Sequence, residues 1–348
     1  MDWIRAFTAK PYPPREALGL IWRNLAGASF RNSEGLRFVP RQTRLNDIEP
    51  RITLGFGGDV MSMFGKALVF DPAVANFFLP CDKVLLNFEG VITERRQISP
   101  DQKHTRPILQ ALDGLAARSK LVLSLANNHT GDFGEVECRQ SLALLREEGF
   151  TAFGLTESPC IDLGERLRVV TGTRWSNREG QHLAWLKDPA QWVRPGAFNL
   201  LYPHWGYELE VYPRRDVAAQ MTQWLAAFDA VVGHHSHTPQ PINVQRGGDG
   251  LLRLAAYSMG DLCFGMAYRN LPTFKYYAFG LIGRMTIGPL HTDPSRWAAG
   301  ELTWSFVECR PLGRGQGFEV VLQDQIPLFA SDAIAAPATA EPQAVSAD

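Results

Sequence analysis

Residues 229–241 read DAVVGHHSHTPQP, an apolar run followed by three histidines within four positions. The whole chain has only eight histidines, so this concentration calls for an explanation. The segment is either a metal-binding site or a polar turn that happens to contain histidines. If the backbone is extended here, His235 and His237 point to the same side, because alternate side chains of a strand share one face. That arrangement suits chelation and favours the metal-binding interpretation.

Four other apolar runs, at residues 52–58, 83–89, 120–126 and 198–203, resemble the run that precedes these histidines. Near-continuous apolar runs are typical of strands covered on both faces of a sheet. Helical patterns at 107–118, 134–148 and 213–228 alternate with them, which predicts the α/β class. After Gly250 the sequence becomes β-rich, which indicates a second sheet or a β-rich completion of one large domain.

All five predicted strands end in polar residues that could bind metal. The ends are Asp59, Asn87-Phe88-Glu89, Asn127-Asn128-His129, His204-Trp205-Gly206-Tyr207-Glu208 and His234-His235-Ser236-His237. In α/β sheets, ligands bind beyond the carboxyl ends of the strands. Taken singly, Asp59 or Glu89 could be an ordinary turn residue, and His204 could be a packed histidine. Taken together, the five ends predict a metal site.

Composition and charge limit the classes of protein. The net charge is −1 and no long basic arm is visible, so nucleic acid is not an expected partner. No signal peptide and no apolar run of membrane-spanning length is recognised, which predicts a cytoplasmic location without a transmembrane segment. We expect an N-terminal extension at 1–50, one domain at 51–330, and a disordered Ala/Pro-rich tail at 331–348.

A series of motifs matches a known family in order and spacing. They are GGDVM (57–61), NFEG (87–90), LANNHTGDFGE (125–135), HWGYE (204–208), GHHSHTPQP (233–241) and YSMGDLCFG (257–265). The series resembles the CapA/PgsA family of bacterial capsule synthesis proteins, which is linked to poly-γ-glutamate capsules. That family is similar in turn to the calcineurin-like metallophosphoesterases. The resemblance implies a four-layer α/β/β/α sandwich of the metallo-dependent phosphatase type, built around two metal ions.

The resemblance also implies roles for individual residues. The metal ligands would be Asp59, Glu89, Asn128, His204, His235 and His237. His129 would face the substrate as an acid or a stabiliser of negative charge, and Asn128 would share in catalysis as well as binding metal. Residues expected to support this site are Asn87, Asn127, Asp132, Glu208 and His234. Asp261 stands where the family more often has asparagine.

Three functions remain open at this point. Carboxylate, amide and imidazole ligands suit Mn, Fe or Zn, and a pair of such ions would favour hydrolysis of a phosphoester or a γ-glutamyl amide. The same site could instead epimerise an amino-acid residue of a peptide. A third possibility is a non-catalytic, metal-stabilised subunit that binds other capsule-synthesis proteins. An anionic small molecule, peptide or polymer is the expected substrate, and Lys103, Arg106 and Arg174 are candidates to bind it.

Overall fold

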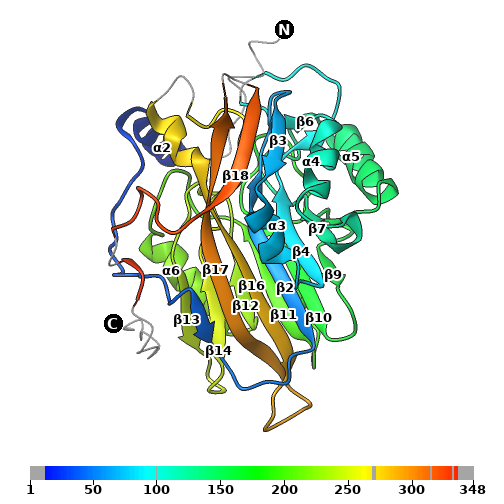
Figure 1. Cartoon of the computed structure of the whole chain (residues 1–348), viewed down its shortest axis with the longest axis vertical. Helices are drawn as coiled ribbons and strands as arrows, with labels where there is room; N and C mark the ends of the chain where they lie inside the picture. Colours follow the sequence, from blue (N-terminus) through cyan, green and yellow to red (C-terminus); the bar gives the residue numbers. More distant parts are fainter. Residues whose placement is uncertain (1–11, 99, 269–271, 314–315, 331–332, 336–348) are drawn as a thin grey trace.

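Two β-sheets lie face to face at the centre of the protein, and helices cover their outer faces (Figure 1). The computed structural model describes residues 12–98, 100–268, 272–313, 316–330 and 333–335. The architecture is the α/β/β/α sandwich that the resemblance implied. The ends of its parallel strands carry the candidate metal ligands.

The first sheet has ten strands, with the order β3-β18-β17-β16-β2-β4-β7-β8, while β1 pairs with β17 and β15 pairs with β2. Their bounds are β1 Gln42–Arg44, β2 Ile52–Val60, β3 Ala67–Phe70, β4 Lys83–Phe88, β7 Leu121–Ser124, β8 Thr151–Phe153, β15 Asp261–Cys263, β16 Phe279–Pro289, β17 Trp297–Leu312 and β18 Gly317–Gln323. Strands β2, β4, β7 and β8 run parallel to one another. Their carboxyl ends therefore meet at one edge.

The second sheet has six strands, with the order β13-β14-β12-β11-β10-β9. Their bounds are β9 Cys160–Asp162, β10 Leu167–Thr173, β11 Phe198–His204, β12 Ala230–Val232, β13 Ile242–Arg246 and β14 Leu252–Ala256. Strands β10, β11, β12 and β14 are parallel. A separate pair is formed by β5 Val91–Ile92 and β6 Lys103–His104. All five strands expected from the apolar runs are present, but they are divided between the two sheets.

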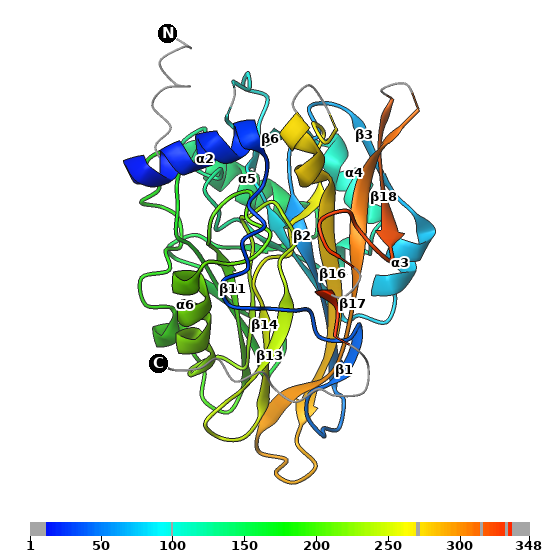
Figure 2. The same cartoon turned by 90° about the vertical axis from the view of Figure 1, so that its left-hand side faces the viewer.

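The helices form the outer layers, which Figure 2 shows with α6 on one side and α3 and α4 on the other. Their bounds are α2 Pro14–Ala26, α3 Pro72–Phe78, α4 Pro107–Asp113, α5 Glu135–Glu147 and α6 Arg215–Leu225, with 3-10 turns at Arg118–Lys120, Pro189–Trp192 and Pro272–Ala278. Helix α6 buries Val217, Met221 and Leu225, at helical spacing, against the second sheet. Apolar side chains from facing strands fill the space between the sheets. The apolar runs that alternate with helical patterns in the sequence are thus strands buried on both faces of a sheet.

The β-rich segment after Gly250 is shared between the sheets. Strand β14 joins the second sheet, whereas β16, β17 and β18 extend the first. The sequence indicated a second sheet or a β-rich completion of one large domain, and the segment contributes strands to both sheets. Among the described residues, no helix combines the length and the apolar character needed to cross a membrane.

The described part of the N-terminal segment packs on the sandwich. Strand β1 pairs with β17, and helix α2 lies against the turn at Pro272–Ala278. Residues 1–11 of the predicted extension, and most of the tail predicted at 331–348, lie outside the described residues. Within that tail, Ala333 and Ala335 exchange backbone hydrogen bonds with Phe38. The division into extension, domain and tail remains a proposal.

Candidate metal centre

Two buried carboxylates lie at the carboxyl ends of neighbouring parallel strands, Asp59 on β2 and Glu89 just after β4. Asn87 connects them, since its amide donates to Asp59 Oδ1 at 2.8 Å and lies 3.4 Å from Glu89 Oε2. Glu89 Oε1 has no hydrogen-bond partner, although the side chain is fully buried. A buried carboxylate oxygen without a partner is costly, so this atom is suited to a cation.

The loop after β7 brings an amide oxygen to the imidazole that ends β11. Asn128 Oδ1 lies 2.7 Å from His204 Nε2, and His204 Nδ1 lies 3.2 Å from the Asn87 amide. The Asn127 side chain holds this loop, because it donates to the Phe88 carbonyl and accepts from the backbone N–H groups of residues 129 and 130. The sequence predicted that these strand ends meet, and the structure brings them together from different sheets.

The histidine segment adopts a conformation that the sequence did not predict. His235 and His237 have φ angles of 93° and 54°, so the backbone is left-handed at both positions and not extended. The two rings nevertheless lie close, with centroids 5.9 Å apart. Left-handed non-glycine residues cost roughly 1–3 kcal/mol each and concentrate at functional sites. His234 belongs to none of the candidate metal groups but lies beside one of their members, with its Nδ1 3.0 Å from Asp59 Oδ1.

Asp261 is a further buried carboxylate of the cluster, and the sequence analysis did not assign it a ligand role. It opens β15, which lies beside β2 with Asp261 opposite Asp59. Its Oδ1 lies 2.9 Å from His237 Nδ1, and its Oδ2 has no hydrogen-bond partner. The available signal was that Asp261 follows closely after the largely apolar stretch 251–259, as polar residues follow the other five apolar runs.

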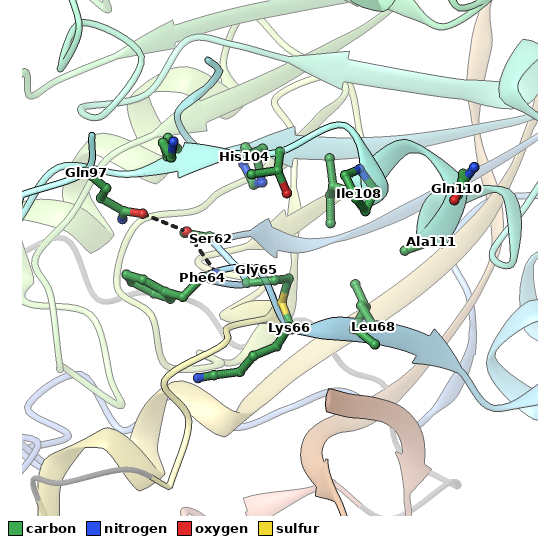
Figure 3. A pocket seen from close by; sticks show the side chains of 15 residues that line it. Ser62, Phe64, Gly65, Lys66, Leu68, Gln97, His104, Ile108, Gln110 and Ala111 are labelled. Atoms are coloured by element: carbon green, nitrogen blue, oxygen red, sulfur yellow. Dashed lines mark hydrogen bonds between the residues drawn. The ribbon is translucent and has the colours of Figure 1, made fainter. Parts of the chain in front are cut away.

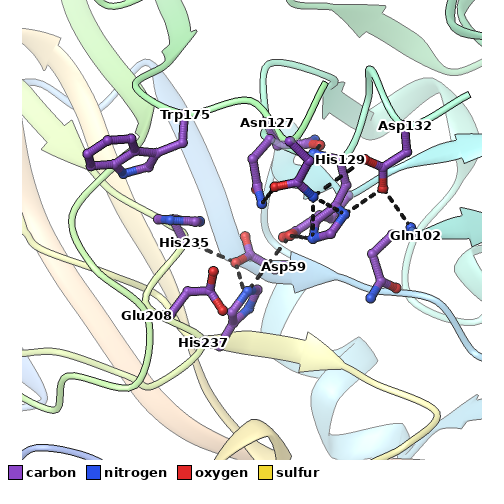
Figure 4. A network of polar contacts seen from close by, with 12 residues as sticks. Asp59, Gln102, Asn127, His129, Asp132, Trp175, Glu208, His235 and His237 are labelled. Carbon is purple, nitrogen blue, oxygen red and sulfur yellow. Dashed lines mark hydrogen bonds and ion pairs between the residues drawn. The ribbon is translucent and has the colours of Figure 1, made fainter. Parts of the chain in front are cut away.

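These residues form three overlapping groups that could each hold a cation. The groups are Glu208 with His235 and His237, Asp59 with His237 and Asp261, and Asp59 with Glu89 and His204. Figure 4 shows the first group together with Asp59. Within each group the ligand atoms lie within 4.8 Å of one another. Carboxylates and imidazoles are ligands that Mn, Fe and Zn accept. The residues present therefore fit a divalent metal, and Glu208 belongs with the candidate ligands.

The electrostatics of the cluster also favour a cation. Burial raises the pKa of Glu89 well above its ordinary value, and it raises that of Asp261 to about 7 despite the opposing effect of His237. Burial also lowers the pKa of His235 well below that of a free imidazole. Several carboxylates are thus crowded in a site that solvates their charge poorly, a condition that a bound cation relieves.

His129 lies beside the cluster and is oriented by Asp132. Its Nδ1 is 2.6 Å from Asp132 Oδ2, and its Nε2 is 3.7 Å from Glu89 Oε1. Nδ1 also lies 2.9 Å from the Asn177 amide nitrogen, so Asp132 and Asn177 together fix the ring with Nε2 directed at the cluster. The side chain also lines the adjoining cavity. His129 is therefore placed to move a proton between the cavity and the cluster.

Tyr12 reaches the cluster from the N-terminal segment, and nothing in its local sequence indicated this. Its hydroxyl lies 2.6 Å from Glu208 Oε1 and 2.5 Å from His235 Nε2. Trp175 packs edge-on against the Tyr12 ring, with centroids 4.9 Å apart. Burial and the adjacent Glu208 raise the pKa of Tyr12 well above its ordinary value, so the hydroxyl keeps its proton. Tyr12 thereby ties the start of α2 to two candidate ligands.

Replacing Tyr12 by phenylalanine tests this connection in protein treated with a chelator. We expect the free energy of unfolding to fall by about 1–2 kcal/mol, because Glu208 and His235 each lose a largely buried partner. Urea denaturation measures the change. Tyr207→Phe is the matched control, since its hydroxyl bonds Asp216 at an exposed position and its loss should cost less than about 0.5 kcal/mol. Equal losses in both variants would contradict the role given to Tyr12.

The three cations predicted to bind substrate lie away from the cluster. Lys103 lines a separate cavity of about 490 Å³ (Figure 3), and its ammonium donates to the carbonyls of residues 93 and 95. Arg106 is exposed and pairs with Glu148. Arg174 lies over the Trp175 ring at 5.1 Å. None of the three lines the cavity beside the cluster, so their predicted role is not supported by their positions.

The fold is an α/β/β/α sandwich in which the ends of parallel strands bring the candidate ligands together. The chain belongs to the bacterial capsule synthesis protein family PGA_cap, whose model matches residues 53–162 and 165–266.

The chain spans about half the length of the relatives that it matches in sequence. A probable polyglutamine synthesis accessory protein of Mycobacterium tuberculosis is 29% identical over 216 residues, covering 52% of this chain and 55% of that protein. The PGA biosynthesis protein CapA of Bacillus subtilis is 22% identical over 222 residues, covering 56% of each. A hypothetical protein from Thermus thermophilus aligns in structure with a TM-score of 0.42 and 16% identity, over 74% of this chain and 99% of that one.

Proposed function

We propose that the protein is a metal-dependent hydrolase of an ester or amide bond, acting in capsule or polymer biosynthesis. The observation that carries the proposal is the position of His129, between a cluster of candidate metal ligands and a cavity of about 610 Å³. The names of the relatives, which refer to polyglutamine synthesis and PGA biosynthesis, support the assignment to polymer biosynthesis.

The ligands proposed for two divalent ions, Mn, Fe or Zn, are Asp59, Glu89, Asn128, His204, Glu208, His235, His237 and Asp261. When bound, such ions polarise the bond to be cleaved and activate water at neutral pH. The chain itself supplies orientation and proton transfer. Asp132 fixes the His129 ring through Nδ1. When both ring nitrogens are protonated, Nε2 gives its proton to the leaving group, or stabilises the charge there, and the ring regains a proton from the attacking water.

Replacing His129 by glutamine should lower kcat by about 10²- to 10³-fold while metal content is unchanged, because a proton-transfer group is lost and no proposed ligand is removed. The assay is cleavage of a chromogenic phosphodiester and of a γ-glutamyl anilide by metal-loaded protein. His291→Gln is the matched control, since that imidazole is more than half exposed. A His129→Gln variant with wild-type kcat would rule out the proton-transfer role.

The two other interpretations predict different results with the same protein. An epimerase would incorporate deuterium from D₂O at an alpha carbon of a peptide without cleaving it. A non-catalytic subunit would keep its partner proteins after chelation and show no turnover. Cleavage that requires the metal and His129 distinguishes the hydrolase from both.

A further inference from the structure

The cavity beside the cluster has a largely apolar wall. It measures about 610 Å³, and helix α2 contributes one side of it through Ala17, Leu20, Ile21 and Asn24. The other apolar lining residues are Met61, Phe64, Pro100, Phe264, Met266, Phe274 and Tyr277. Uncharged amides supply part of the polar wall, namely Gln97, Gln102, Asn128 and Asn177, and its ionisable side chains include Asp101, Glu208, His129 and His237. The space next to the candidate metals therefore suits an uncharged group.

No lysine or arginine is among the described residues that line this cavity. Its two acidic side chains already have partners, since Asp101 accepts from Arg178 at 2.9 Å and Glu208 accepts from Tyr12. In the neighbouring cavity, Lys66 and Lys103 each donate to backbone carbonyls. Recognition of a carboxylate or phosphate normally uses arginine or lysine. The described part of this cavity wall contains neither residue type.

The proposed metals would not supply the missing positive charge. The groups that could hold them contain four carboxylates, Asp59, Glu89, Glu208 and Asp261. Four carboxylates carry up to four negative charges, which equals the charge of two divalent cations. A loaded cluster would thus be close to neutral and would attract a polyanion only weakly.

We infer that the cavity binds an uncharged carboxamide or peptide segment with an apolar part, and that it discriminates against a polyanion. The inference rests on the proposed function, because it names the substrate class of the same site. It runs against the anionic substrate that the sequence suggested. An anionic chain entering this wall would lose water from its charges and would meet no lysine or arginine among the described residues. The two lining histidines, His129 and His237, are already assigned to proton transfer and to metal binding.

Two oligomers that differ only in charge test the inference. One is a tetramer of γ-linked glutamate, and the other is the same tetramer with every α-carboxylate converted to a carboxamide. Both carry an N-terminal naphthoyl group, which permits measurement by fluorescence anisotropy on metal-loaded wild-type protein. We expect the carboxamide tetramer to bind at least about tenfold more tightly. Equal or tighter binding of the anionic tetramer, or no binding of either, would overturn the inference.

A matched pair of variants on α2 tests whether the tetramers bind inside this cavity. Leu20 lines the cavity, whereas Leu18 on the same helix is 68% exposed. Leu20→Arg should increase the affinity for the anionic tetramer about tenfold, in a salt-dependent manner, and Leu18→Arg should leave it within about twofold. Equal effects of the two variants would show that the tetramer binds outside the cavity, which also overturns the inference.

Measurements of binding and of cleavage distinguish a failure of this inference from a failure of the proposed function. Selective binding of the carboxamide tetramer without hydrolysis of any substrate would leave the inference standing and reject the hydrolase. Metal-dependent cleavage with a preference for the anionic tetramer would support the hydrolase and overturn the inference.

Discussion

The double variant His235→Ala, His237→Ala is expected to lose nearly all of its bound metal. The two imidazoles share one candidate group with Glu208, and His237 also belongs to the group formed with Asp59 and Asp261. Removing both therefore takes ligands from two of the three candidate groups, one of which shares Asp59 with the third. Loss of supporting contacts alone weakens metal affinity by about 10- to 100-fold, so loss of two direct ligands should weaken it by more than about 100-fold. Elemental analysis of purified protein measures the result.

A second pair of histidines provides the control. His182→Ala with His291→Ala removes the same number of imidazoles outside the candidate groups, and it should keep the wild-type metal content. Circular dichroism of both double variants establishes that they are folded. Equal metal content in wild type and the His235, His237 double variant would disprove the metal centre.

Replacing Gly58 by alanine is expected to destabilise the protein by at least about 3 kcal/mol. A Cβ at this position would lie 2.3 Å from the carbonyl oxygen of Gly260, where the backbone of β15 approaches β2. Neither backbone can move without disturbing Asp59, the next residue, or Asp261 opposite it. We therefore expect the metal content of any folded variant to fall as well. Thermal and urea unfolding measure the stability.

Gly248→Ala is the corresponding control, since no atom lies within 4 Å of a Cβ added there. It should change the free energy of unfolding by less than about 1 kcal/mol. If Gly58→Ala were as stable as Gly248→Ala, the close approach of β2 and β15 would not exist in solution.

Much of the secondary structure was predictable because it depends on local patterns. The apolar run at 198–203 corresponds to β11, Phe198–His204, and the periodic segment at 213–228 contains α6, Arg215–Leu225. Burial on both faces of a strand, or on one face of a helix, leaves a direct signature in the order of residues. The polar strand ends were visible for the same reason.

Other features of the site depend on contacts that local patterns do not encode. The left-handed backbone at His235 and His237 is imposed by surrounding structure, because these residue types rarely prefer it. The positions of Lys103, Arg106 and Arg174 away from the cavity could not be read from their charge. A lysine or arginine in a loop can lie at a binding site or on the surface, and the packing of the folded chain decides which.

The sequence by itself determined the α/β class, the principal strands and the polar groups at their ends, because each follows from residues close together in the chain. Only the tertiary structure brought Asp261 beside Asp59 and placed Tyr12 against His235, which is 223 positions away. It also left the described cavity wall without a lysine or arginine. Such features arise from the pairing and packing of distant segments, and their free energy depends on neighbours that no local pattern specifies.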